Sequence, residues 1–204
     1  MPGCDWTSER AVVPLSPPRP RPGPRRLPPW LVLALALIAP GAGAVPVTAS
    51  LDAATAAYVY NLIKFTRWPE AITEGLAAWR VCIRTGPALA RQLEELAGRT
   101  AQGRPLEIVR LAPGAPPGPC QVLVLQDLTA AELRALLRRA RRLPLLTVTT
   151  DRETPTSGQV VRLYLEGRRI RFDIDLAAAS RAGLGLSAKL LGLAQRVIRP
   201  EAGP

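Results

Sequence analysis

The sequence predicts an α/β fold in which a mainly parallel sheet carries helices on both faces and ends in an antiparallel hairpin. Segments with strand and helix periodicity alternate along the chain after residue 45. The run "CQVLVL" at 120–125 is almost continuously apolar, which is typical of a central strand in a parallel sheet. Near the end, two segments of alternating polarity flank Glu166-Gly167, and this pattern indicates a hairpin.

The first element is a helix predicted over residues 51–67. Its apolar residues recur at steps of three and four, which marks one helical face. Trp68 precedes Pro69 and is therefore disfavoured in the helical region, so the helix is expected to end there. Lys64 and Arg67 fall on other faces and are expected to be exposed. The apolar face consists of Ala54, Tyr58, Leu62 and Phe65.

The middle of the chain alternates between predicted strands and helices. Gly86 and Pro87 open a helix that Gly98 closes. Thr129 and Glu132 have the spacing of a capping box and begin a third helix. The predicted strands are 79–83, 105–111, 120–125, 144–150, 159–165 and 168–176, and a final helix is predicted over Leu184 to Val197.

The first 44 residues have the pattern of a signal peptide. A basic region, "RPRPGPRR", precedes ten apolar residues, "WLVLALALIA", and Ala42 to Ala44 fit cleavage at small residues. Ten apolar residues are too few to span a bilayer, which needs about 20. Export to the periplasm and a single domain over residues 45–204 are expected, and the alternative is an uncleaved anchor behind a Pro/Arg tail.

The charge balance does not indicate a nucleic-acid partner, although the formal net charge is +11. A basic excess raises the question of DNA, RNA or anionic membranes. Here the arginines are scattered, and they accompany a general abundance of Ala, Leu, Gly and Pro. An exported protein also seldom meets DNA, so no nucleic-acid partner is expected.

The chain after the leader keeps two cysteines, Cys82 and Cys120, while Cys4 lies in the leader. An even number in an exported chain suits one bridge. In a sheet of order 2-1-3 the first and third strands are neighbours, which would bring the two cysteines together. The alternative is two buried free thiols. The chain has no His, so a zinc site would lack ligands and no metal is expected.

The sequence contains no familiar catalytic set, so no enzyme and no cofactor are expected. After the first strand, "RTGPALARQL" has one Gly where a dinucleotide fingerprint needs three. The helix start at Gly86 either receives an anion or is a structural turn. The absence of His removes any histidine base for Ser or Cys.

Asp173 and Asp175 are the only closely spaced carboxylates, and they share one face of a predicted strand. Such a pair can carry out acid/base chemistry or bind a metal. Asp175 also precedes "LAAAS" and would cap a helix, so the pair is predicted to have capping and surface roles. The arginine face of the helix after Thr129 is either solvated or placed against lipid headgroups.

Two stretches of the chain resemble the YfiR family. Residues 58–69, "YVYNLIKFTRWP", are similar to the family's signature near the mature N-terminus, and residues 163–197 are similar to its C-terminal hairpin and helix. Cys82, Cys120 and "LLTV" lie in the expected order between them. The resemblance therefore covers essentially the whole chain after the leader.

The resemblance implies a periplasmic protein with a Rossmann-like α/β sandwich that forms a homodimer. It implies a repressor that binds the periplasmic sensor domain of an inner-membrane diguanylate cyclase and so acts in cyclic di-GMP signalling and biofilm formation. It also implies a Cys82–Cys120 disulfide. The sequence departs from the family at Asp175, where Asn is usual, at the single Gly158, where a glycine pair is usual, and in lacking a second disulfide. These departures leave open whether residues 151–159 form a partner surface.

The candidate partner-binding residues are Arg67, Trp68, Pro69, Arg171 and Asp173. A Trp held by a following Pro at a helix end is either a structural plug or a rigid hot spot for a partner. An alternative function is a periplasmic small-solute-binding protein serving a transporter or sensor, with its pocket at the carboxyl edge of the sheet. A third is a hydrolase with an unrecognised carboxylate site.

Overall fold

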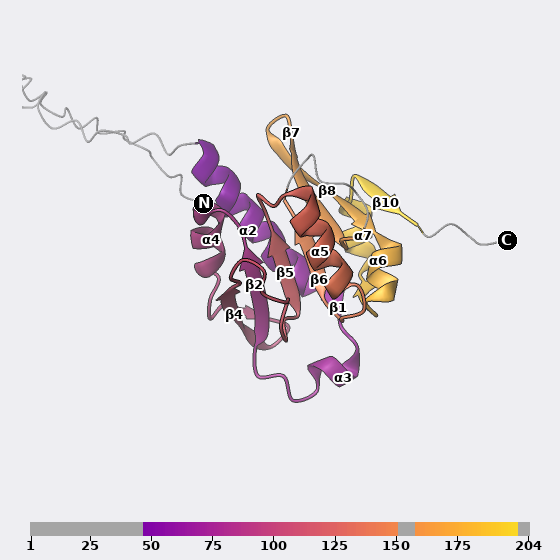
Figure 1. Cartoon of the computed structure of the whole chain (residues 1–204). Helices are drawn as coiled ribbons and strands as arrows, with labels where there is room; N and C mark the ends of the chain where they lie inside the picture. Colours follow the sequence, from indigo (N-terminus) through magenta and orange to yellow (C-terminus); the bar gives the residue numbers. More distant parts are fainter. Residues whose placement is uncertain (1–46, 151–157, 200–204) are drawn as a thin grey trace, which may run out of the picture. The chain divides into compact units, whose positions relative to one another are not determined.

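A computed structural model describes residues 47–150 and 158–199 of the chain (Figure 1). Side chains are described from Leu51 onwards. The expected signal peptide and most of the 151–159 loop lie outside the described residues. The elements are α2 (Val47–Phe65), β1 (Thr66–Arg67), α3 (Glu70–Thr73), β2 (Trp79–Arg84), α4 (Pro87–Glu94), β3 (Thr100–Ala101), β4 (Arg104–Arg110), β5 (Val122–Leu125), α5 (Ala130–Ala140), β6 (Leu146–Thr149), β7 (Val161–Glu166), β8 (Arg169–Asp175), α6 (Leu176–Arg181), β9 (Gly185–Leu186), α7 (Ala188–Leu193) and β10 (Arg196–Ile198).

The eight-stranded sheet has the order β10-β8-β7-β6-β5-β2-β4-β3. Its centre, from β4 to β7, is parallel, and β7 and β8 form the antiparallel hairpin. The first predicted strand, β2, lies between the second and the third, β4 and β5, so the 2-1-3 order is confirmed. The predicted fold class, an α/β sandwich with a mainly parallel sheet and a C-terminal hairpin, is also confirmed.

Alternate residues of the central strands point into two separate cores, because successive side chains of a strand face opposite sides of the sheet. Val81 and Val122 belong to the core that α2 and α4 cover, together with residues of α6 and α7. Cys82 and Leu123 belong to the core under α5. Figure 1 shows α5 in front of the strands that α2 crosses from behind. Helices therefore cover both faces of the sheet, as expected.

The first helix ends earlier than predicted, at Phe65. Thr66 and Arg67 form β1, which pairs antiparallel with Leu186 and Gly185 of β9. The Thr66 hydroxyl donates to the Leu62 carbonyl at 2.8 Å. The backbone N–H of Ser187 donates to the Phe65 carbonyl at 3.0 Å. The last turn of α2 is thus completed by side-chain and long-range bonds, which the helical pattern does not encode.

The predicted final helix over residues 184–197 is wrong. The segment instead forms β9, the short helix α7 and the strand β10, which pairs parallel with β8. Ser187 starts α7, since its hydroxyl accepts from the Leu190 N–H at 3.2 Å. After α7 the chain is extended at Ala194, and the Gln195 N–H donates to the Phe172 carbonyl at 2.8 Å.

Candidate functional site

Trp68 lies in the core, and only 8% of it is exposed. Its indole N–H donates to the Gln121 carbonyl at 3.3 Å, and its ring lies 4.5 Å from the Trp79 ring, centroid to centroid. Trp79 is fully buried and donates to the Ala101 carbonyl at 2.8 Å. These contacts favour the structural plug over the partner hot spot for Trp68.

Arg67 and Pro69 lie against residues 183–185, which form the turn after α6 and the first residue of β9. Arg67 is exposed, and a Cβ placed on Gly185 would lie 3.4 Å from its Nε. Pro69 is half-buried, and a Cβ placed on Gly183 would lie 3.2 Å from its Cγ. The two stretches that carry the family resemblance therefore meet, and Arg67 and Pro69 form an outer surface where they join.

Asp173 does not lie on the surface, which corrects the surface role predicted for it. It is 3% exposed, and its Oδ2 accepts from Nη2 of Arg162 at 2.6 Å. The Tyr164 hydroxyl donates to Oδ1 at 3.2 Å. Burial, followed by the charge of Asp173, raises the pKa of Tyr164 above its ordinary value. Asp173 thus joins β7 to β8 and offers a partner little surface.

The remaining candidates on the hairpin have local partners. Arg171 is partly exposed, and its Nε lies 3.5 Å from Oε2 of Glu166. Asp175 caps α6 by accepting from the Ala178 N–H at 2.8 Å, so the predicted capping role is confirmed. The partners of Asp173 were missed from the sequence, although a two-residue turn pairs Glu166 with Arg169 and so places Arg162 opposite Asp173.

The carboxylate of Asp127 lies beside the helix start at Gly86. A Cβ placed on Gly86 would lie 2.8 Å from Oδ2 of Asp127. The Gly86 N–H donates to Oε1 of Gln126 at 3.3 Å. A carboxylate at this position already meets the positive end of α4, and an incoming anion would be repelled. The geometry therefore favours the structural turn over an anion site.

A hollow with a mixed polar and apolar lining opens at the carboxyl ends of β5 and β6. Burial, and then repulsion by Asp127, raise the pKa of Asp52 above its ordinary value, while Arg91 acts in the opposite direction. A carboxyl group, hydroxyls and an amide around one hollow can hydrogen-bond a small polar solute. The polar residues that line it are Asp52, Thr55, Gln126, Thr150 and Tyr164.

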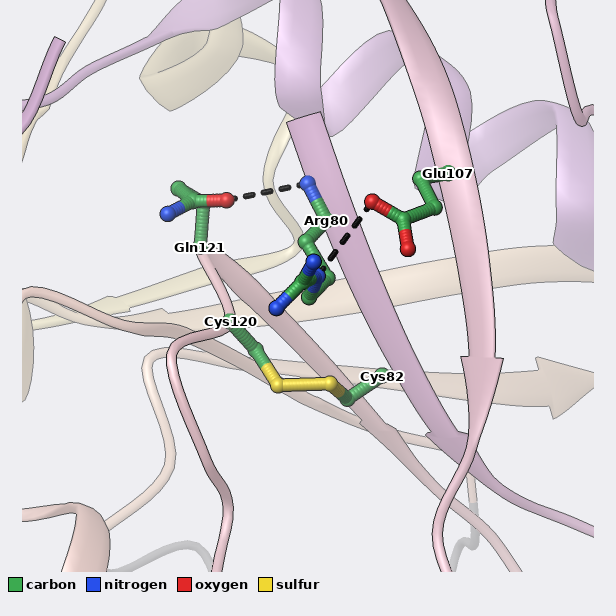
Figure 2. The surroundings of a disulfide bond; sticks show 5 residues. All are labelled: Arg80, Cys82, Glu107, Cys120 and Gln121. Carbon is green, nitrogen blue, oxygen red and sulfur yellow. Dashed lines mark hydrogen bonds and ion pairs between the residues drawn. A yellow bond between two sulfur atoms is a disulfide. The ribbon is translucent and has the colours of Figure 1, made fainter. Parts of the chain in front are cut away.

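Cys82 of β2 and Cys120, just before β5, form a disulfide with their Cα atoms 5.9 Å apart. Figure 2 shows it beside Arg80, whose Nε lies 3.3 Å from Oε2 of Glu107. The Arg80 backbone N–H donates to Oε1 of Gln121 at 2.9 Å. Both cysteines are buried, so the bridge fastens the neighbouring strands from within and is shielded from solvent.

The match to a family model decides the relationship. A model described as YfiR/HmsC-like matches residues 52–195, from the first turns of α2 to the residue before β10. The chain belongs to the YfiR/HmsC-like family. No curated protein matches it.

The YfiR/HmsC-like match spans both stretches that meet at β1 and β9, and it spans both cysteines. Within residues 47–150 and 158–199, the domain contains no group of three or more His, Cys, Asp or Glu residues that could hold a metal ion. In the same ranges, each helix is too short or too polar to cross a membrane. Membership supports a periplasmic regulator of a diguanylate cyclase at the level of the family.

Proposed function

We propose that this YfiR/HmsC-like protein is a non-enzymatic regulator that works in the periplasm, as a homodimer, by inhibiting a membrane diguanylate cyclase through the cyclase's periplasmic sensor domain. The observation that carries the proposal is the family match over residues 52–195, which contains nearly all of the α/β domain. The structural contacts of Asp173 and Asp175 also leave neither carboxylate as a free catalytic group.

The physical mechanism is differential affinity. A binder that prefers the inactive conformation of the sensor domain shifts the population of the cyclase towards that conformation. To move an equilibrium from almost fully active to almost fully inactive, the preference must reach about 10⁴-fold. The exposed residue Arg67 and the half-buried residues Pro69 and Arg171 remain the proposed contact residues.

Deletion of the gene tests the proposal. Loss of an inhibitor should raise cellular cyclic di-GMP and surface attachment, and a copy that carries its leader should restore repression. A copy lacking residues 2–44 should stay in the cytosol and fail to restore it. Intact mass of the periplasmic fraction should find a mature chain beginning at Val45. Unaltered cyclic di-GMP in a strain that demonstrably expresses a cognate cyclase would refute the proposal that this protein is an inhibitor.

The hollow around Asp52 supports a second candidate, a periplasmic small-solute-binding protein that serves a transporter or sensor. Pockets at the carboxyl edge of an open α/β sheet are a usual ligand position. A thermal-shift screen of small polar metabolites tests it. A stabilising solute should lose its effect when Asp52→Asn and Thr150→Val are combined, and a shift that survives both changes would place the solute elsewhere.

A further inference from the structure

Four arginines surround one groove between α5 and α6. Arg134 and Arg138 lie on α5, and Arg141 is its C-cap residue; the steps of four and three residues place the three along a single side of the helix. The fourth, Arg181, ends α6. All four are exposed. The residues that line the groove are Arg134, Leu137, Arg138, Arg141, Gly158 and Arg181.

The floor of the groove is apolar. Leu137 is buried, and a Cβ placed on Gly158 would lie 3.6 Å from its Cδ1. The groove continues into a neighbouring hollow, which Arg141 and Arg181 also line. Ala178 of α6 and Ala182, the C-cap residue of this helix, line the hollow with small apolar side chains. The result is a concave surface with an apolar base and a cationic rim.

The rim charges are not neutralised within the part of the chain that the structure describes. None of the four arginines of the groove forms an ion pair there. Other arginines of the domain do, since Arg84 pairs with Glu132 and Arg162 pairs with Asp173. Like charges gathered around a concavity raise the local positive potential and attract anionic groups. Charges at the rim of an interface act mainly on the rate of association and on partner choice.

We propose that this α5–α6 groove binds an acidic segment of a partner protein, with Asp or Glu side chains on the arginine rim and apolar side chains on the floor. The inference rests on the proposed function, because the partner would be the periplasmic domain that the protein regulates. A segment of chain can enter the groove and reach Leu137. A flat bilayer would meet the rim and leave the floor uncovered, so the concave shape selects a protein segment over lipid headgroups.

The test compares two variants of equal charge in the exported, full-length protein. The groove variant carries Arg→Gln at Arg134, Arg138, Arg141 and Arg181. The control variant carries Arg→Gln at Arg142, Arg168, Arg169 and Arg196, which are exposed and lie outside the groove. Each variant lowers the net charge by the same amount, so a difference between them reports on position rather than on total charge.

The probe is a short fluorescein-labelled peptide of alternating Glu and Ala, with a Gln and Ala peptide as its neutral counterpart. Fluorescence anisotropy near physiological ionic strength should show that the native protein prefers the acidic peptide. The groove variant should lose about tenfold or more in affinity, while the control variant should change by less than about threefold. Equal losses of peptide affinity in the two variants would overturn the proposal that the groove is the binding site.

Two further arms separate other occupants. Co-sedimentation with phosphatidylglycerol vesicles that depends on the groove arginines, without peptide binding, would overturn the proposal in favour of lipid. A change of sedimentation coefficient in the groove variant alone would assign the groove to a second copy of the chain. If the fourfold variant fails to fold, the pair Arg138→Gln and Arg181→Gln replaces it, measured against Arg142→Gln and Arg196→Gln.

Repression in cells distinguishes failure of the groove from failure of the proposed function. When deletion of the gene raises cyclic di-GMP, the groove variant should fail to restore repression and the control variant should succeed. Full repression by a folded groove variant would overturn the proposal that the groove binds the partner, but it would leave the proposed inhibitor function intact. If deletion has no effect while peptide binding still depends on the groove arginines, the proposed inhibition of a cyclase is refuted and the proposed binding of an acidic segment in the groove is supported.

Discussion

At the scale of single residues, the carboxylates of this domain form structural contacts. Asp173 pairs with Arg162, Asp175 caps α6, and Asp127 lies against Gly86. Glu132 completes the capping box of α5, with its Oε2 accepting from the Thr129 N–H at 3.0 Å. A change at any of these residues is therefore expected to act first on folding stability.

We expect Asp173→Asn to lower the free energy of unfolding by about 3 kcal/mol, because it removes the charge that faces a largely buried guanidinium. The side chain of Arg162 is 15% exposed. Urea unfolding followed by circular dichroism measures the change. Asp175→Asn is the matched control, since Asn caps a helix as well as Asp does, and its effect should stay below about 0.5 kcal/mol. Equal losses in the two variants would contradict a structural ion pair at Asp173.

We expect the stabilising effect of Glu132 to depend on pH. Hydrogen bonds from the Thr129 hydroxyl and N–H, followed by the bond to Arg84, hold the pKa of Glu132 below its ordinary value of 4.5. A carboxyl group whose pKa is lower in the folded state stabilises the fold above the unfolded pKa and loses this effect as pH falls through the folded pKa.

The variant Glu132→Gln should therefore unfold at lower urea than the native chain at neutral pH, and the difference should shrink in acid, as the pH falls through the lowered pKa of Glu132. Glu74→Gln, at an exposed glutamate, should leave the midpoint unchanged at both pH values. A difference in urea midpoint between Glu132→Gln and the native chain that grows in acid would contradict a lowered pKa of Glu132 in the folded state.

At the scale of elements, the β1–β9 ribbon holds the end of α2 against the turn after α6. Gly183 is required there because its φ is +67°, a left-handed conformation that residues with a Cβ adopt only with strain. The same residue lies against Pro69, which leaves little room for a side chain. The turn thus joins two parts of the chain through close backbone packing.

We expect Gly183→Ala to lower the free energy of unfolding by about 1–2 kcal/mol, since it combines a strained conformation with a tight contact. Gly192→Ala is the matched control. Gly192 lies in α7 with no atom near the position of a Cβ, so Ala should stabilise the helix by about 0.5 kcal/mol. Thermal unfolding of both variants gives the comparison, and a loss of stability at both glycines would contradict a local cause.

The parallel strands and the caps were predictable because their signals are local. The central strands are short apolar runs, and Thr129 lies within three residues of the Glu132 that completes its cap. Residues 184–197 could not be predicted in this way. Their leucines have helical spacing, but the pairing of β9 with β1 and of β10 with β8 comes from segments far away in the sequence.

The candidate site was predictable in part. Lys64 and Arg67 are exposed as expected. The burial of Trp68 depends on Trp79 and Gln121, which no local pattern connects to it. The α5–α6 groove could not be predicted from the sequence either. The spacing of the arginines predicts one basic face of a helix, but it does not indicate that Arg181 lies across from that face.

At the scale of the whole molecule, contacts in both cores stabilise the eight-stranded sheet from its two faces. The disulfide lies in the α5 core, and the two tryptophans lie in the core that α2 and α4 cover. The bridge joins β2 to the start of β5, on either side of the point where the strand order reverses. It therefore constrains the centre of the sheet rather than a surface loop.

We expect thiol labelling of the denatured, unreduced mature chain to find neither Cys82 nor Cys120 free. Reduction should lower the free energy of unfolding by about 4 kcal/mol in the chain-entropy estimate for a separation of 38 residues. A double variant, Cys82→Ala with Cys120→Ala, should unfold at the same urea concentration with and without reductant. Two reactive thiols per native chain would contradict the bridge.

The pairing of β1 with β9 also determines when the domain can finish folding. Leu184 and Leu190 share a core with Val59 and Leu62 of α2, so a segment near the C-terminal end of the domain packs beside the first helix that the structure describes. Contacts between such distant parts of a chain form late, because a long loop must close before they contribute. A chain that emerges N-terminus first therefore leaves part of the apolar face of α2 exposed until its end is available. During that interval the helix is the segment a chaperone would need to shield from aggregation.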